Sequence, residues 1–298
     1  MKLRAPTQND VPETLAVLRA FDAEAWGDSD WNEQDLREHW DELDLERDAW
    51  IAELDGRIAG YADVTVRGPR VIADGYVAPD LRGRGVGSAL VEAVERRALE
   101  EPGRVYVHYA TLGEWSAPFF EARGYRPVRH QWRMVIDLEE EPEAPAPEGI
   151  EIRPYRAGEE RAIHEALEEA WSVGGWEYQP RTFEEYAKGT FERPGHDPTL
   201  CLVAVVDGTL AGASLNDWKR NGDWGWIGTL GVRPAFRRRG IAEALLKRSF
   251  AEFFRRGERR VALGVDAQSP TGATRLYERA GMHVLYEVIV YEKELRAG

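Results

Sequence analysis

The sequence predicts an α/β protein made of two tandem domains. At 298 residues the chain is long for one hydrophobic core and suits two domains of about 145 residues each. One pattern, a strand followed by an arginine- and glycine-rich turn and a helix, occurs at 75–90 and again at 228–245. An acidic, proline-rich stretch at 141–149 lies between the two copies. We therefore expect an N-terminal domain at 1–140, a stiff linker at 141–149 and a C-terminal domain at 150–298.

The first half of the chain alternates strand and helix signals. Asn9 and Pro12 supply a cap and a first-turn proline for a helix that extends to about Phe21. Asp55 and Gly56 predict a tight hairpin between two strands. The expected elements are strands at 2–5, 49–54 and 57–66, a helix at 33–43, a central strand ending at Val77 with its helix, a strand at 104–109, a short helix at 117–124 and a closing hairpin over 125–138.

The second half repeats this plan. Asp207 and Gly208 predict the equivalent hairpin. Leu246, Phe250 and Phe253 mark the apolar face of the helix after the second turn, which Gly257 ends. The expected elements are a strand at 150–154, helices at 159–171 and 182–188, strands at 200–206, 210–216 and 225–232, that helix, a strand at 260–265, a short helix at 271–280 and a closing hairpin to Leu295.

Composition excludes several classes of function. The net charge of −14 argues against binding nucleic acid or an anionic membrane and suits a cationic acceptor. The longest apolar run, 200–206, is far below the roughly 20 residues that span a bilayer, and the N-terminus lacks the apolar core of a secretory signal, so we expect a cytoplasmic protein. Cys201 lies in an apolar stretch and is expected to be a buried, inert thiol. The six histidines show no ligand spacing, so no metal site is expected.

The turn at 237–240 has the properties of a diphosphate-binding site. Gly240 opens the following helix without a side chain, so the first-turn N–H groups can converge on an anion with help from the helix dipole. Arg237, Arg238 and Arg239 add guanidinium donors. Neither the Gly-Lys-Ser/Thr of a nucleotide-triphosphate loop nor a Gly-x-Gly-x-x-Gly fingerprint is present.

The spacing that does fit is Arg-x-x-Gly-x-Ala, filled by Arg237, Gly240 and Ala242. It resembles the GCN5-related N-acetyltransferase (GNAT) family, in which this turn holds the pyrophosphate of acetyl-coenzyme A. The segment 273–281 resembles the closing helix of that family, and the first copy places Arg82, Gly85 and Gly87 at the motif positions. The resemblance covers nearly the whole chain and implies two GNAT-like domains, each a mixed, mostly antiparallel twisted sheet flanked by helices.

The resemblance also implies a cofactor and its contacts. Acetyl-coenzyme A would donate an acetyl group directly to the amine of a small molecule, with its pantetheine paired to the central strand. The expected cofactor-binding residues are Leu230, Gly231, Val232, Arg237, Arg238, Arg239, Gly240, Ile241, Ala242 and Glu243 in the second copy and Tyr76, Val77, Arg82, Gly83, Arg84, Gly85, Val86, Gly87 and Ser88 in the first.

An acid and a base are needed for this reaction. Family members often carry a glutamate base on the central strand, but here the nearest counterpart is Trp226. Asp266 and Asp223 are substitutes, each of which is alternatively a solvated or ion-paired carboxylate. For the departing thiolate, Tyr277 matches the family's tyrosine acid, the alternative being that its ring only fills the core.

The two copies differ at that position. Phe120 replaces the tyrosine in the first copy, so we expect the N-terminal domain to be non-catalytic and to bind the cofactor weakly or serve structure, although Asp74 remains a possible base. The expected acceptor wall comprises Trp171, Trp176, Glu177 and Tyr178, which equally suit an ordinary aromatic core. A non-catalytic coenzyme A-binding sensor or scaffold is the competing class, and both monomer and homodimer remain open.

Overall fold

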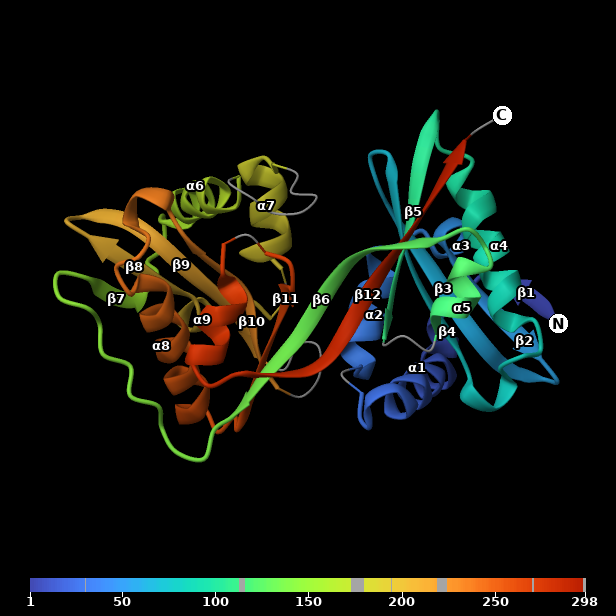
Figure 1. Cartoon of the computed structure of the whole chain (residues 1–298), viewed down its shortest axis with the longest axis horizontal. Helices are drawn as coiled ribbons and strands as arrows, with labels where there is room; N and C mark the ends of the chain where they lie inside the picture. The colour runs from blue at the N-terminus through green and yellow to red at the C-terminus, as the bar shows by residue number, and fades with distance from the viewer. Residues whose placement is uncertain are drawn as a thin grey trace. The chain divides into compact units, whose positions relative to one another are not determined.

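The computed structural model describes residues 1–29, 31–112, 116–172, 180–193, 195–218, 224–269 and 271–296. Tertiary contacts divide the chain into two compact units (Figure 1). Unit 1 comprises Met1–Gln131 with Tyr286–Gly298, and unit 2 comprises Trp132–Leu285. Each unit contains a mixed sheet flanked by helices, which confirms the predicted fold class.

The sheet of unit 1 has the strand order β1-β2-β3-β4-β5-β12. Its pairs are antiparallel apart from β4 and β5, which run parallel. Asp55 adopts φ 54° in the hairpin between β2 and β3, as the sequence predicts. The strands are β1 (Lys2–Arg4), β2 (Ala49–Leu54), β3 (Arg57–Arg67), β4 (Arg70–Val77), β5 (Arg104–Leu112) and β12 (His283–Arg296).

Helices cover both faces of this sheet (Figure 1). Alternation along β3 separates the faces, because Tyr61 bonds to Trp40 of α2 while a Cβ on Gly60 would meet Val86 and Leu90 of α4. Helix α1 has its proline in the first turn and ends at Trp26, beyond the predicted end, with Gly27 as its C-cap. The helices are α1 (Val11–Trp26), α2 (Glu33–Asp41), α3 (Leu45–Asp48), α4 (Val86–Ala98) and α5 (Ala117–Glu121).

Unit 2 repeats the arrangement with the strand order β6-β11-β10-β9-β8-β7. Here β10 and β11 form the parallel pair, and β7, β8, β9 and β10 pair antiparallel. The strands are β6 (Arg126–Asp137), β7 (Glu151–Pro154), β8 (Leu202–Val206), β9 (Thr209–Trp218), β10 (Gly225–Val232) and β11 (Arg260–Asp266), and the helices are α6 (Glu160–Trp171), α7 (Phe183–Thr190), α8 (Ile241–Arg255) and α9 (Ala273–Arg279).

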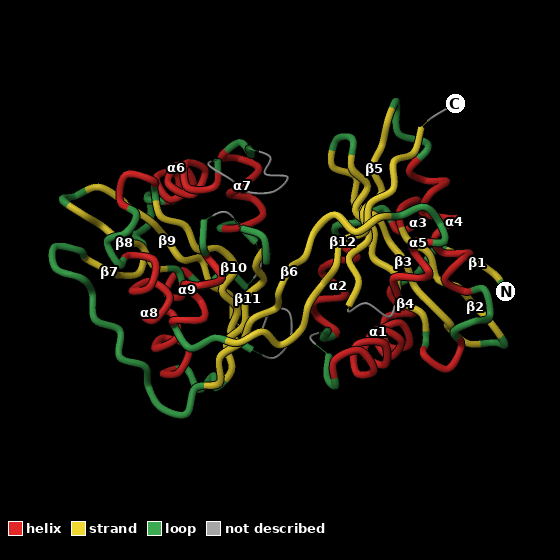
Figure 2. The backbone as a smooth tube through the Cα atoms, in the orientation of Figure 1, coloured by secondary structure: helices red, strands yellow, loops and turns green. Residues whose placement is uncertain are grey.

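The two closing segments do not form the predicted hairpins. Residues 125–138 contain the single strand β6, and the end of the chain forms the single strand β12, each drawn without interruption in Figure 2. The hairpin prediction was wrong because neither segment turns back on itself. Instead, β12 pairs along β5 in unit 1, while Leu138, next to β6, donates to the carbonyl of Arg259 in unit 2. The last strand of the chain therefore belongs to the first unit, unlike the linear division at 141–149 that the repeat suggests.

A buried polar network holds α8 against the sheet of unit 2. The amide of Asn216 on β9 donates to the Leu200 carbonyl at 2.7 Å and to the Ser249 hydroxyl of α8 at 2.9 Å. Its carbonyl oxygen accepts from Ser214 at 2.8 Å. Asn216 is 1% exposed, so every group in the network depends on protein partners. Nearby Cys201 is buried as predicted, and burial raises the pKa of its thiol to about 11.

No helix among the described residues is both long and apolar enough to cross a membrane.

The network makes a testable contribution to stability. Replacing Asn216 by alanine leaves the Leu200 carbonyl and two serine hydroxyls without their buried partner, so we expect Asn216→Ala to lower the free energy of unfolding by about 2–3 kcal/mol. Urea denaturation measures this loss. Gln268→Ala, at an exposed position, is the control and should change stability by no more than about 0.5 kcal/mol. Equal stability of both variants would contradict the role of the network.

Candidate functional site

The parallel strands β10 and β11 of unit 2 separate before either strand ends. Residues 225–226 of β10 pair with 261–262 of β11, and no further partners join these two fully described strands. On its other edge β10 stays paired with β9 as far as Val232. Backbone groups of Leu230 and Gly231 that face β11 therefore lie outside the sheet ladder. An exposed strand edge of this kind can pair with an extended ligand.

A glycine lies opposite each opened segment. A Cβ built on Gly212 of β9 would lie 2.5 Å from the carbonyl oxygen of Gly231, and one on Gly60 of β3 would lie 2.7 Å from that of Tyr76. No other residue fits such an approach. The recurrence of these glycines in the two copies therefore reflects the close crossing that each opened strand requires.

The turn after β10 presents backbone donors to an anion. Arg238 and Gly240 have φ values of 62° and 79°, and Gly240 is the N-cap of α8 without any side-chain cap. The amide of Ala244 donates to the Gly240 carbonyl, so the N–H groups of 241–243 precede the hydrogen-bond ladder of the helix. They lie at the positive end of the helix dipole, where a phosphate binds favourably.

The guanidinium of Arg237 bonds to backbone carbonyls of the protein. It donates to the carbonyl of Val232 at 3.1 Å and to that of Ala170 at 2.7 Å. Ala170 lies in the last turn of α6, whose carbonyls lack helical partners. Arg233 adds an ion pair with Glu169 of the same helix. The motif arginine thus fixes the turn to α6, and its side chain is not directed by these bonds toward a ligand.

Arg238 and Arg239 are the exposed cations of this turn. Arg238 has no hydrogen-bond or ion-pair partner among the described residues, and Arg239 lies 6.0 Å from the ring centroid of Phe236. These side chains are available for charge-assisted bonds to an anion.

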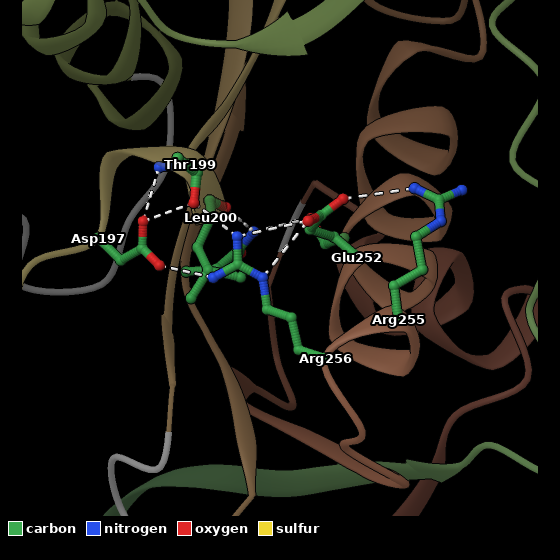
Figure 3. Close-up of polar contacts among 8 residues, drawn as sticks. Asp197, Thr199, Leu200, Glu252, Arg255 and Arg256 are labelled. Atoms are coloured by element: carbon green, nitrogen blue, oxygen red, sulfur yellow. Dashed lines mark hydrogen bonds and ion pairs between the residues drawn. The ribbon is translucent and has the colours of Figure 1, made fainter.

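The opposite end of α8 is anchored by Arg256 (Figure 3). Its guanidinium bonds to Asp197 and Thr199 at 2.5 Å each and reaches Glu252 on its own helix. Glu252 also accepts from Arg255. Together with the Asn216 network, these bonds fix the helix whose first turn carries the unpaired N–H groups of 241–243.

Tyr277 lies on α9 in an apolar cluster with Phe250, Phe253 and Leu263. It is 8% exposed, and burial raises the pKa of its hydroxyl to about 12. The phenol therefore remains protonated at neutral pH, as a proton donor must. Phe120 of unit 1 is equally buried and stacks on Tyr291 with a centroid separation of 5.2 Å.

Of the other predicted site residues, some lie in the described part of the chain and some do not. Asp266 ends β11 and accepts a bond from the Gln268 amide at 2.8 Å, so one of its oxygens forms a turn. Trp171 borders the opened strand, because a Cβ on Gly231 would lie 3.4 Å from its indole nitrogen. Asp223, Trp176, Glu177 and Tyr178 lie outside the described residues.

The first copy of the turn has a similar backbone conformation, but its arginines are paired with carboxylates. Gly83 and Gly85 have φ values of 74° and 84°, and β4 pairs with β5 only over 70–73, which leaves Tyr76 and Val77 beyond the pairing. Arg82 forms an ion pair with Glu24 and Arg84 with Asp55. A carboxylate beside each arginine weakens attraction for a diphosphate, in contrast with Arg238 in unit 2. The rest of this predicted set, Val86, Gly87 and Ser88, begins α4, where the Ser88 hydroxyl accepts from Arg123 at 2.6 Å.

Sequence reasoning noted Asp74 but missed the group around it. Asp74 on β4 lies directly opposite Asp63 on β3, and Asp63 bonds to the His39 ring at 3.1 Å. The two-residue turn at 68–69 fixes this register, so counting back from it would have paired the two aspartates. Burial, and then the charge of Asp63, raise the pKa of Asp74 to about 6.

Comparison with known proteins gives the family. The chain belongs to the acetyltransferase (GNAT) family, whose model matches residues 13–125 and 161–282. Two matched segments, one in each unit, agree with the repeat found in the sequence.

Individual relatives extend over most of the chain. The mycothiol acetyltransferase of Geodermatophilus obscurus is 29% identical over 252 residues, covering 79% of this chain and 78% of that protein. The one from Salinispora arenicola is 30% identical over 295 residues, covering 93% and 94%.

Solved structures share the tandem fold. A GCN5-related N-acetyltransferase from Sphaerobacter thermophilus has a TM-score of 0.87 and 39% identity, covering 100% of this chain and 96% of that one. A tandem GNAT protein from the clavulanic acid biosynthesis pathway has a TM-score of 0.76 at 20% identity, covering 100% and 98%. The latter likeness is one of fold.

The raised pKa of Asp74 predicts a pH-dependent stability. The folded state binds this proton more tightly than the unfolded chain, so the favourable contribution is complete below pH 3.8 and is lost as pH rises through about 6. Asp74→Asn removes the ionised form, and we expect it to raise the free energy of unfolding by about 1–2 kcal/mol at pH 7 and by nearly nothing at pH 4. Chemical denaturation at both pH values measures the difference. Lower stability of the variant at pH 7 would show that the carboxylate has a favourable partner.

Proposed function

We propose that the protein transfers the acetyl group of acetyl-coenzyme A to the amine of a small molecule by direct attack, and that unit 2 carries out this reaction. One observation carries the proposal: the opened edge of β10 is followed, after the turn at 233–240, by the N-terminus of α8, which has no side-chain cap. A long carrier with a diphosphate at one end and an amide-containing arm at the other matches both features. In unit 1 the equivalent arginines are paired with carboxylates, so that unit binds the donor weakly or serves structure.

The chain's own residues suit such a donor. Acetyl-coenzyme A supplies the thioester whose carbonyl carbon the amine attacks. The amides of 241–243 and the side chains of Arg238 and Arg239 hold the diphosphate. Leu230, Gly231 and Val232 orient the arm through backbone groups that β11 leaves unpaired.

A carboxylate must remove a proton from the acceptor. An alkyl amine with a pKa near 10 is only ~0.1% neutral at pH 7, which adds roughly 4 kcal/mol to the barrier unless a base acts. Asp266, at the end of β11 beside the opening, and Asp223, which precedes β10, are the candidates. The Gln268 amide orients one oxygen of Asp266, and a carboxylate at this edge of the sheet can accept a proton directly or through water.

The departing sulfur must gain a proton. Tyr277 keeps its proton throughout the neutral range because its burial disfavours the phenolate. It can therefore donate to the developing thiolate, whose negative charge draws the proton, and recover it from solvent.

The acceptor is proposed as a small cationic amine. The net charge of −14 favours approach of a cation, and Trp171 beside Gly231 offers an aromatic face. A narrower alternative is mycothiol acetyltransferase activity, as in the relatives of 29–30% identity.

Tyr277→Phe tests the proposed acid. We expect this change to lower kcat about 100-fold with little change in KM, because only proton donation to the leaving group is lost. Acetyl-coenzyme A turnover with a panel of amines, including the mycothiol precursor, is the measurement. Tyr155→Phe, a unit 2 tyrosine bonded to His196, is the control and should retain activity. Equal turnover by wild type and Tyr277→Phe would remove Tyr277 from the mechanism, and donor binding without product from any amine would refute the proposed reaction.

The double variant Arg238→Ser/Arg239→Ser tests the anion site. Loss of two guanidinium groups should weaken coenzyme A binding about tenfold or more, since each charge-assisted bond contributes about 1.5–3 kcal/mol. Arg84 is the residue of unit 1 that is equivalent to Arg239, and it is paired with Asp55. Arg84→Ser should therefore leave the affinity for coenzyme A nearly unchanged. Isothermal titration calorimetry measures both variants. Loss of affinity in Arg84→Ser alone would assign tight donor binding to unit 1.

A further inference from the structure

The acidic, proline-rich segment between β6 and β7 is tied to both ends of α8. Figure 2 shows 138–150 as one long loop without helix or strand. The carboxylate of Glu141 forms an ion pair with Arg255 in the last turn of α8. Six residues later, the ring of Pro147 lies 3.4 Å from the position that a Cβ on Gly240 would take. We call residues 141–147 the strap, because they run from the last turn of α8 to its N-cap.

The strap has little slack. Helix α8 has 15 residues and is therefore about 22 Å long, whereas six residues of fully extended chain span about 20–22 Å. Pro142, Pro145 and Pro147 favour an extended backbone, and the first and last of them are half-buried. The end of the strap is therefore held at the first turn of α8, beside the proposed diphosphate site.

A tight turn fixes the residue that follows the strap. The amide of Ile150 donates to the carbonyl of Pro147 at 3.1 Å, and Gly149 between them has a φ of 73°. A positive φ at this third position is typical of a type II β-turn, in which Glu148 takes the second position. Ile150 is 7% exposed and belongs to the apolar cluster that contains Ile241 of α8. Both ends of the turn are thus anchored at the start of that helix.

Glu148 brings a negative charge to this end of α8. Its side chain is exposed and has no hydrogen-bond or ion-pair partner among the described residues. Consecutive Cα atoms are about 3.8 Å apart, so Glu148 starts roughly 10 Å from Gly240, which is about one Debye length in physiological salt. The free N–H groups of 241–243 and the two exposed arginines lie at the same turn. A diphosphate bound there would therefore experience the charge of Glu148.

A second acid of the same loop lies far from this site. Glu140 is as exposed as Glu148 and likewise has no partner in the described part of the chain. It precedes Glu141, which is tied to Arg255 at the opposite end of α8, so the length of the helix, about 22 Å, separates it from the anion site. Removing either charge changes the net charge of the protein equally. A difference between the two changes therefore reports the distance to the site.

We propose that Glu148 sets the donor affinity of unit 2, because its charge weakens the binding of a diphosphate at the first turn of α8. The inference rests on the donor site proposed above. A carboxylate roughly 10 Å from two phosphate charges repels them weakly through water, which corresponds to a few-fold loss of affinity. The loss applies equally to acetyl-coenzyme A and to the coenzyme A that remains after transfer. The strap thereby speeds release of the product, since weaker binding mainly raises the dissociation rate.

Isothermal titration calorimetry of coenzyme A with the full-length protein tests the proposal without any acyl transfer. At an ionic strength of about 10 mM, where the Debye length is about 30 Å, Glu148→Gln should tighten binding about threefold. At about 1 M the Debye length falls to about 3 Å, and this gain should disappear. Glu148→Asp keeps the charge and should bind coenzyme A as wild type does. Glu140→Gln is the matched control and should change the affinity by no more than about 1.3-fold.

The outcomes separate this inference from the donor site itself. Unchanged or weaker binding by Glu148→Gln, an equal gain in Glu140→Gln, or a gain that persists at high salt would each overturn the role of Glu148. Arg238→Ser/Arg239→Ser, titrated in the same buffer, identifies the site that is measured. If this double variant loses affinity while Glu148→Gln binds as wild type does, the donor site stands and only the role of Glu148 fails. If wild type does not bind coenzyme A, both proposals fail.

Discussion

Both units depend on where parallel strand pairing stops. β4 leaves β5 after Ala73, and β10 leaves β11 after Trp226, while antiparallel neighbours hold the other edges. The glycines at 60 and 212 permit the backbone approach opposite each opened segment. The proposed acetyl transfer uses this opening, because it exposes the backbone of β10 on the side of β11.

A few side chains make the charge around this opening differ between the two copies. In unit 2 the turn keeps exposed arginines, and Leu215 and Thr229 face each other on the strands. In unit 1 carboxylates neutralise the turn, and two aspartates take those strand positions. The charges near the opening therefore differ between the copies: exposed arginines lie on the turn of unit 2, whereas two aspartates face each other on the strands of unit 1.

Local features could be predicted from the sequence and distant contacts could not. The hairpin at Asp55, the helix start at Gly240 and the buried Cys201 each follow from a few adjacent residues. The destination of the Arg237 side chain does not, because the accepting carbonyl at Ala170 is 67 residues away. For the same reason the pairing of His39 with Asp63 escaped notice. A repeat predicts that each copy completes its own sheet, whereas β12 pairs with β5 of the first unit, a long-range contact that no local pattern indicates.

The position of β12 has a consequence for biosynthesis. The edge of β5 is covered by β12, which follows the whole of the second unit in the chain, so the first unit cannot finish folding while the second is still being translated. Until then the backbone N–H and C=O groups on one edge of β5 have no strand partner, and such an edge can pair with other chains. Cutting the gene within 141–149 would not yield two self-sufficient halves, because each fragment would carry a strand that the other one needs.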